Sequence, residues 1–280
     1  MHRGLSLAIG IAAGSAFLAG CSDDKPETIA VEASEPGSGQ FKITAPASVS
    51  GGVVKVEFKN SGELPHEAQL VRVEGDHSQD EVLAIASGDS GEIPDWFLLE
   101  GGVGNTGPGQ SKAATLNLSP GNYFVIDTGS DENENSFAAK GAITAMTVTG
   151  ASSEKVPASG ARIEARDYEF TIPDLEAGDQ EITFDNVGNQ PHLFVAAPIA
   201  PGKTIGDVAA AFESIDDESS GPPPVDFEKA TSVAAIEGKK AMATTLSLEK
   251  GNYAFICFLT DRGGGAPHFT LGMLQEGVVS

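Results

Sequence analysis

Apolar and polar residues alternate in short runs along most of the chain. Val54, Val56 and Phe58 form one such run, and Ile182 and Phe184 belong to another. Gly, Pro, Asn and Ser separate the runs. Alternation with a period of two places every second side chain on the same face of a β-strand, and turn residues between short strands are typical of antiparallel sandwiches. The pattern therefore predicts an all-β fold.

The pattern is present twice. Residues 56–71 align without gaps with residues 182–197, and residues 114–127 align with residues 244–257. In the first alignment a Phe, an Asn, a Gly and a Pro-His pair coincide. Internal similarity of this kind indicates a tandem duplication. It predicts two β-sandwich domains, at residues 40–150 and 155–280.

Each copy also contains a helical insertion after its Pro-His turn. Ser78 with Glu81, and Thr204 with Asp207, have the spacing of capping boxes, and an apolar run follows each pair. In a capping box the two side chains satisfy free backbone N–H groups at the start of a helix. Irregular, exposed segments are expected after these helices, at residues 87–108 and 214–225.

The first residues have the form of a bacterial export signal. Arg3 precedes an apolar run over residues 5–17, and the sequence Leu-Ala-Gly-Cys ends at Cys21. The apolar run is too short for a membrane span, and Leu-Ala-Gly-Cys resembles the lipobox of bacterial lipoproteins. The resemblance implies that the signal peptide at residues 1–20 is removed and that Cys21 carries lipid. Residues 21–39 are then predicted to be a flexible tether.

These features predict an exported protein in the cell envelope, on the periplasmic or the extracellular face, with the lipid anchor as its membrane contact. The alternative is an export signal that stays uncut or is cut elsewhere. The formal net charge of −23 argues against nucleic acid and anionic membrane surfaces as partners. It is compatible with a basic partner protein, with a salty habitat, or simply with a soluble surface.

Candidate chemistry is concentrated near the end of the chain. The sequence has two cysteines, so Cys257 is the lone free thiol if Cys21 carries lipid. A lone thiol in an oxidising compartment is expected to be buried or bound to a metal. His268 and Met273 follow Cys257, and His192 comes from the Pro-His turn of the second copy. Two imidazoles, one thiolate and a weak thioether suit an electron-transfer copper site.

These residues resemble the cupredoxin, or blue copper, family of plastocyanin-like proteins over roughly residues 165–280. In that family a first His follows an F-x-N-x-G-x-x-P-H turn, and a Cys, a second His and a Met come late in the domain. The resemblance implies two tandem cupredoxin-like Greek-key β-sandwiches, each with a short helical insertion. It also implies one type 1 copper held by His192, Cys257, His268 and Met273.

The loop between the last ligands departs from the small members of that family. Ten residues separate Cys257 from His268, whereas small cupredoxins have a much shorter loop. Leu193 also stands where many members carry an Asn that braces the site. By analogy with the family, one edge of the His268 imidazole ring is expected to be solvent-exposed within an apolar surface patch where a redox partner docks.

The first copy lacks most of this ligand set. The alignment places Asp127 opposite Cys257 and Ala138 opposite His268. We therefore predict that the first domain has no copper ligands. His66, which is opposite His192, is expected to serve in packing and hydrogen bonding.

The sequence supports three functions of different classes. The first is a lipid-anchored type 1 copper protein that transfers single electrons to or from a redox partner. The second is copper sequestration or delivery with the same four residues, and the third is a metal-free β-sandwich interaction module. An enzyme is not expected, because the chain has five histidines and no His-x-His pair of the kind that binds further coppers in this superfamily.

Overall fold

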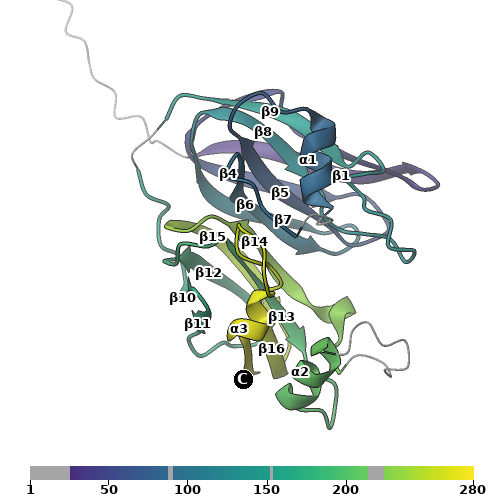
Figure 1. Cartoon of the computed structure of the whole chain (residues 1–280), viewed down its shortest axis with the longest axis vertical. Helices are drawn as coiled ribbons and strands as arrows, with labels where there is room; N and C mark the ends of the chain where they lie inside the picture. Colours follow the sequence, from purple (N-terminus) through teal and green to yellow (C-terminus); the bar gives the residue numbers. More distant parts are fainter. Residues whose placement is uncertain (1–25, 88–90, 152–153, 214–223) are drawn as a thin grey trace, which may run out of the picture.

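The chain folds into two β-sandwich units, which lie one above the other in Figure 1. The structure is a computed structural model that describes residues 26–87, 91–151, 154–213 and 224–280. Strands make up most of the described residues, and helices are short. The predicted all-β fold with two β-sandwich units is confirmed.

The described part of the N-terminal unit has nine strands and one helix. These are β1 (Glu27–Gly37), β2 (Gln40–Thr44), β3 (Ser48–Ser50), β4 (Gly52–Asn60), β5 (His66–Val73), α1 (Gln79–Ala86), β6 (Phe97–Thr106), β7 (Ser111–Leu118), β8 (Gly121–Ile126) and β9 (Ile143–Thr149).

The C-terminal unit has eight strands, two α-helices and one short 3₁₀ helix among its described residues. These are β10 (Ala161–Arg166), β11 (Glu169–Thr171), β12 (Gly178–Asn186), β13 (His192–Pro198), α2 (Ile205–Glu213), η1 (Phe227–Lys229), β14 (Thr231–Ile236), β15 (Lys240–Leu248), β16 (Gly251–Ile256), α3 (His268–Leu271) and β17 (Leu274–Val279).

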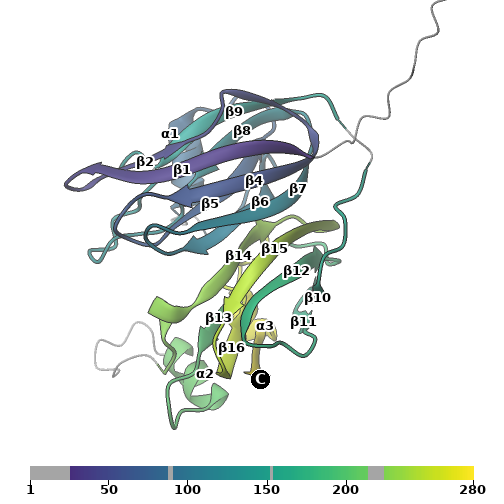
Figure 2. The same cartoon turned by 180° about the vertical axis from the view of Figure 1, so that it is seen from behind.

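The strand pairing extends both sheets through both units. Figure 2 shows the two units from the side opposite to that of Figure 1. One sheet has eight strands in the order β11-β10-β12-β15-β7-β4-β1-β2, and the other has nine in the order β17-β16-β13-β14-β6-β5-β8-β9-β3. The units join where β15 pairs with β7 and β14 pairs with β6, each antiparallel. Within each unit the chain passes repeatedly from one sheet to the other, and the buried side chains between the sheets form the main core.

The predicted tether at residues 21–39 is wrong over β1. Ile29, Val31 and Ala33 are buried in the core, and β1 pairs in parallel with β4. Their spacing of two residues places all three side chains on one face of the strand. Pro26 directly precedes β1, and Pro36 and Gly37 are its last two residues, so the sandwich begins before residue 40.

The predicted irregular segment at residues 87–108 is wrong over β6, a strand with mostly buried positions. Its glycines are required by close packing between backbones. A Cβ at Gly102 would lie 1.9 Å from the carbonyl oxygen of Ala68, and one at Gly104 would lie 2.0 Å from that of Ser232 in the C-terminal unit. Glycine here marks the approach of neighbouring strands, including the strand across the unit boundary.

Both predicted capping boxes are confirmed. The Ser78 hydroxyl accepts from the Glu81 N–H, and the Glu81 carboxylate accepts from the Ser78 N–H at the start of α1. Thr204 and Asp207 make the same pair of bonds before α2. Each box satisfies backbone N–H groups that the first helical turn leaves free.

Among the described residues, no helix is long and apolar enough to cross a membrane. The predicted signal peptide, the lipidation site at Cys21 and the first residues of the predicted tether lie outside the described part of the chain.

Candidate metal centre

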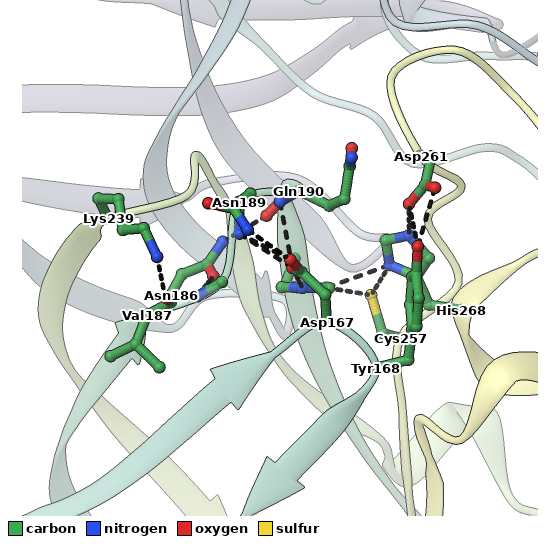
Figure 3. A network of polar contacts seen from close by, with 12 residues as sticks. Asp167, Tyr168, Asn186, Val187, Asn189, Gln190, Lys239, Cys257, Asp261 and His268 are labelled. Atoms are coloured by element: carbon green, nitrogen blue, oxygen red, sulfur yellow. Dashed lines mark hydrogen bonds and ion pairs between the residues drawn. The ribbon is translucent and has the colours of Figure 1, made fainter.

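Three potential ligands, His192, Cys257 and His268, converge inside the C-terminal unit. Figure 3 shows two of them, Cys257 and His268, from close by. His192 begins β13, Cys257 follows β16 directly, and His268 begins α3. The Cys257 Sγ lies 3.8 Å from the His192 Nδ1 and 3.5 Å from the His268 Nδ1. The two Nδ1 atoms are 3.1 Å apart. All three side chains are buried, so the three donor atoms face one another and are shielded from solvent.

The turn before His192 is shaped by Asn186, the last residue of β12. The Asn186 side-chain N–H groups donate to the carbonyl oxygens of Gln190 and Ile236, and its Oδ1 accepts from the Gly188 N–H. One buried amide therefore closes the turn and ties it to the end of β14. Figure 3 shows this residue beside the site. The sequence analysis used the Asn as a motif position and missed its structural role.

Backbone hydrogen bonds connect Cys257, His268 and Met273. The Cys257 N–H donates to the Met273 carbonyl, and the Met273 N–H donates to the His268 carbonyl. The Phe269 N–H donates to the Cys257 carbonyl. Met273 is fully buried. Its role as a weak axial ligand stays a prediction.

Each histidine is held by a carboxylate on the nitrogen that faces away from Cys257. The Asp167 Oδ1 lies 3.1 Å from the His192 Nε2, and the Asp261 Oδ1 lies 3.1 Å from the His268 Nε2. An N–H at Nε2 that donates to a carboxylate leaves the Nδ1 lone pair free for a metal. The carboxylates therefore select the tautomer in which both Nδ1 atoms have a free lone pair.

The two carboxylates are themselves fixed. The Asp167 side chain accepts from the backbone N–H groups of Asn189 and Gln190, and the Asp261 side chain accepts from the Tyr168 hydroxyl (Figure 3). Sequence reasoning missed both aspartates. Asp167 lies 25 residues before His192, and nothing local in the sequence indicates this contact.

Burial sets the protonation states of the three side chains. It lowers the pKa of His192 to about 4 and also lowers the pKa of His268. Both imidazoles are therefore neutral near pH 7, as metal ligands must be. Burial raises the pKa of the Cys257 thiol to about 11, against the opposing effect of hydrogen bonds from the backbone of Leu193 and Leu259. A metal that binds here displaces the thiol proton.

The spacing of the donors fits a small metal ion. Metal–nitrogen bonds of about 2.0 Å and a metal–sulfur bond of about 2.3 Å, arranged in a plane, place the donors roughly 3.5 to 3.8 Å from one another. The observed separations of 3.1, 3.5 and 3.8 Å are close to these values. Two imidazoles and one thiolate form the trigonal set of an electron-transfer copper site. The residues present therefore fit copper.

The expected exposed edge of His268 is not observed. The side chain has no exposed surface, because Asp261 covers the Nε2 atom and the Tyr168 ring packs beside the imidazole at 5.2 Å between ring centres. The long loop between Cys257 and His268 carries Asp261 to this position.

The corresponding position in the N-terminal unit holds an ion cluster. The His66 Nδ1 lies 2.5 Å from the Asp127 Oδ2, and its Nε2 lies 3.1 Å from the Glu35 Oε1. The Phe137 ring packs on His66 at 4.9 Å. Asp127 thus takes the place of the thiol, as the alignment indicated. The predicted role of His66 in packing and hydrogen bonding is confirmed.

No protein-family profile and no curated protein sequence matches this chain. Among solved structures, it is similar to auracyanin from Roseiflexus castenholzii, with 22% identity over 44% of this chain and 96% of that one and a TM-score of 0.29. It is also similar to a copper nitrite reductase from Nitrosomonas europaea, with 16% identity over 91% and 94% and a TM-score of 0.29. A multicopper oxidase matches with 14% identity over 90% and 88% and a TM-score of 0.25.

The prediction that the chain is not an enzyme is contradicted by these comparisons. Two of the similar structures are named as enzymes, and each match covers nine-tenths of this chain. The count of histidines argued only against sites built from His-x-His pairs. One fold accommodates both carriers and catalysts, so a count of one residue type is not sufficient to exclude catalysis.

Proposed function

We propose that the chain is a copper protein that binds one type 1 copper in the C-terminal unit and transfers single electrons. The observation that carries this proposal is the convergence of two Nδ1 atoms and one Sγ, with both Nε2 atoms held by carboxylates. Bound there, copper would exchange one electron between Cu(II) and Cu(I). Fixed ligands suit this role because little has to move when the charge changes.

Copper sequestration or delivery is the second function that uses the same residues. A delivery protein must release its metal, which is easier when a ligand reaches the surface. All three donors are buried, and both imidazoles are held on their second nitrogen. These contacts favour retention of the metal and hence the electron-transfer function.

Copper titration of the purified chain tests the proposal. We expect uptake of one Cu(II) per chain, an intense visible absorption from the thiolate, and reversible loss of that absorption on reduction. Colourless binding restricted to Cu(I) would instead support sequestration or delivery. Absence of stoichiometric uptake in either oxidation state would contradict both and leave the metal-free interaction module.

We further propose that the redox partner contacts an aromatic surface beside Cys257. The Phe258 ring follows Cys257 in the chain and is 37% exposed, and the neighbouring Phe227 ring is 41% exposed. Phe212 and Phe269 pack beneath Phe258. Exposed aromatic rings that cluster in this way mark interaction sites. The side chain of His268 has no exposed surface. Phe258, which follows the proposed ligand Cys257 directly, is exposed at this aromatic surface.

The charge of the chain favours a basic partner. The formal net charge is −23, and Asp226 and Glu228 flank Phe227 in the sequence. Complementary charge steers association, while the apolar centre of an interface supplies most of its affinity.

Replacing Phe258 by Ala is expected to slow electron exchange with a basic c-type cytochrome by about tenfold, equivalent to about 1.4 kcal/mol of lost contact energy. Stopped-flow mixing measures the rate. Val278→Ala is the matched control, because Val278 is 68% exposed and lies on β17. Reduction by ascorbate should be unchanged in both variants. Equal rates with the cytochrome in the Phe258→Ala, Val278→Ala and wild-type chains would exclude this surface.

We also propose that the protein is exported and is anchored in the cell envelope by lipid on Cys21. The support is the apolar run followed by Leu-Ala-Gly-Cys at the start of the chain. In a bacterial host, Cys21→Ser is expected to move the protein from the membrane fraction to the soluble fraction. The same distribution for variant and wild type would contradict the anchor.

A further inference from the structure

The loop between Cys257 and His268 rests against the N-terminal unit, and one arginine makes most of the contact. The Arg262 Nη1 donates to the carbonyl oxygens of Ile93, Pro94 and Phe97, at 3.4, 2.9 and 3.2 Å. The Nη2 also donates to the Phe97 carbonyl, at 3.2 Å. Ile93 and Pro94 lie in the segment between α1 and β6, and Phe97 is the first residue of β6. A planar guanidinium with five donors suits a concave set of carbonyl oxygens, which a lysine satisfies less well.

A carboxylate completes this contact. The Glu237 Oε1 accepts from the Arg262 Nη2 and also, at 2.8 Å, from the backbone N–H of Leu99 in β6. The Glu237 N–H in turn donates to the Leu99 carbonyl at 2.8 Å. Glu237 is almost fully buried. The positive charge is therefore compensated inside the boundary between the units, where charge-assisted hydrogen bonds are strong.

Backbone contacts hold the loop at the same place. The Ile93 N–H donates to the Arg262 carbonyl at 2.9 Å, and the Thr260 hydroxyl donates to the Gly91 carbonyl at 3.1 Å. The Arg262 N–H donates to the Gln190 side chain at 3.1 Å. Gln190 lies two residues before His192, and its own N–H donates to Asp167. The loop is thus connected both to the N-terminal unit and to the turn that carries the first histidine.

The next residue in the loop completes the link to the metal centre. Asp261 precedes Arg262 and holds the His268 Nε2. Fixing Arg262 therefore fixes the position of the carboxylate that orients His268. A long loop that is free in solution loses conformational entropy when a metal orders it, whereas a loop held in advance has already lost that entropy.

From these contacts we infer that the N-terminal unit, through the carbonyl groups at 93–97 and Arg262, holds the ligand loop of the C-terminal unit in its metal-binding conformation. Arg262 is a positioning residue, which acts on His268 through Asp261. The inference rests on the proposed copper function for its effect on the metal. It assigns a role to the copy that lacks the thiol and the second histidine.

The test compares Arg262→Gln with Arg162→Gln in the full chain. Arg162 is 56% exposed and pairs with Glu164 and Asp185 on the outside of the C-terminal unit, so it is a matched control. In Arg262→Gln we expect copper transfer to a competing chelator to be roughly 10 to 100 times faster, the range for loss of an outer contact of a metal site. The relative intensities of the visible absorption bands of the copper-loaded chain are also expected to change, because the orientation of the His268 imidazole changes. Arg162→Gln should match the wild type in both measurements.

A second measurement needs no metal. In the copper-free chain, hydrogen exchange of the amides at 258–266 is expected to be faster in Arg262→Gln, while exchange in β12 stays unchanged. Glu237→Gln, which keeps an acceptor for Leu99 but removes the negative charge, should produce a smaller change in the same direction. Wild-type exchange at 258–266 in Arg262→Gln would overturn the inference. A wild-type chain that binds no copper would instead refute the proposed function, and the exchange experiment would still decide on the inference.

Discussion

Replacing Cys257 by Ser is expected to abolish the visible absorption of the copper-loaded chain and to weaken Cu(II) binding by more than roughly 100-fold. Loss of a residue that only supports a ligand costs up to about 100-fold in metal affinity, so loss of the ligand itself should cost more. The thiolate supplies both the negative charge and the soft donor of the proposed site. A serine hydroxyl does not ionise near pH 7 and is a poor ligand for copper. Within the residues that the structure describes, Cys257 is the only cysteine, so no second thiol can replace it beside His192 and His268.

Absorption spectroscopy and competition with a copper chelator measure this effect. Cys21→Ser is the matched control, since it removes the other cysteine of the sequence. It should bind one copper with wild-type affinity and colour. If Cys257→Ser kept the visible band, or if Cys21→Ser lost it, the assignment of the ligand would be wrong.

Replacing Asp127 by Ala is expected to destabilise the N-terminal unit by about 3 kcal/mol, the lower end of the cost of removing one partner from a buried ion pair. Asp127 and His66 are both buried, and their closest atoms are 2.5 Å apart. Burial alone would lower the pKa of His66, but the bonds to Asp127 and Glu35 raise it. The imidazolium is therefore the form that the folded unit favours, and the variant leaves it with one carboxylate.

The effect depends on pH in a defined direction. A raised folded-state pKa of His66 contributes stability that is fully present below the unfolded pKa of about 6.5 and is lost as the pH rises through the folded value. The destabilisation by Asp127→Ala should therefore be largest in mildly acidic solution and smaller at high pH. Part of the destabilisation should remain at high pH, because neutral His66 can still donate a hydrogen bond to Asp127 in the wild type.

Chemical denaturation at several pH values measures this change. Asp76→Ala is the control, because Asp76 is an exposed aspartate of the same unit. We expect its free energy of unfolding to stay within about 0.5 kcal/mol of the wild type. Equal stability of Asp127→Ala and Asp76→Ala would show that the ion cluster does not stabilise the unit.

The candidate ligands were predictable from the sequence because Cys257 and His268 lie close together near the end of the chain and His192 ends a Pro-His turn. The internal repeat then served as a control. The Pro-His pairs at residues 65–66 and 191–192 coincide when the copies are aligned, and Asp127 coincides with Cys257. The aligned strands β8 and β16 have the same length, so the structure places Asp127 and Cys257 at equivalent strand ends. A gap-free alignment preserves the strand register, and register decides which side chains face the core.

Two errors at the level of secondary structure have different causes. β1 was assigned to the tether although Ile29, Val31 and Ala33 alternate, because the adjacent Pro and Gly residues outweighed a short apolar pattern. The predicted irregular segment at residues 87–108 contains β6, in which Gly102 and Gly104 lie among mostly buried positions. Glycine indicates either a turn or a close approach of two backbones. Which of the two applies depends on the neighbouring strand.

The sequence alone was sufficient to predict the alternating strands, the capping boxes of α1 and α2, and the candidate ligands His192, Cys257 and His268. These features depend on residues within a few positions of one another, or on a repeat that the chain displays directly. Only the tertiary structure decided that Asp167 and Asp261 hold the imidazoles and that Arg262 joins the ligand loop to the first unit. Such contacts depend on which strands pair across the two sheets and on how the units meet, and neither leaves a periodic trace in the sequence.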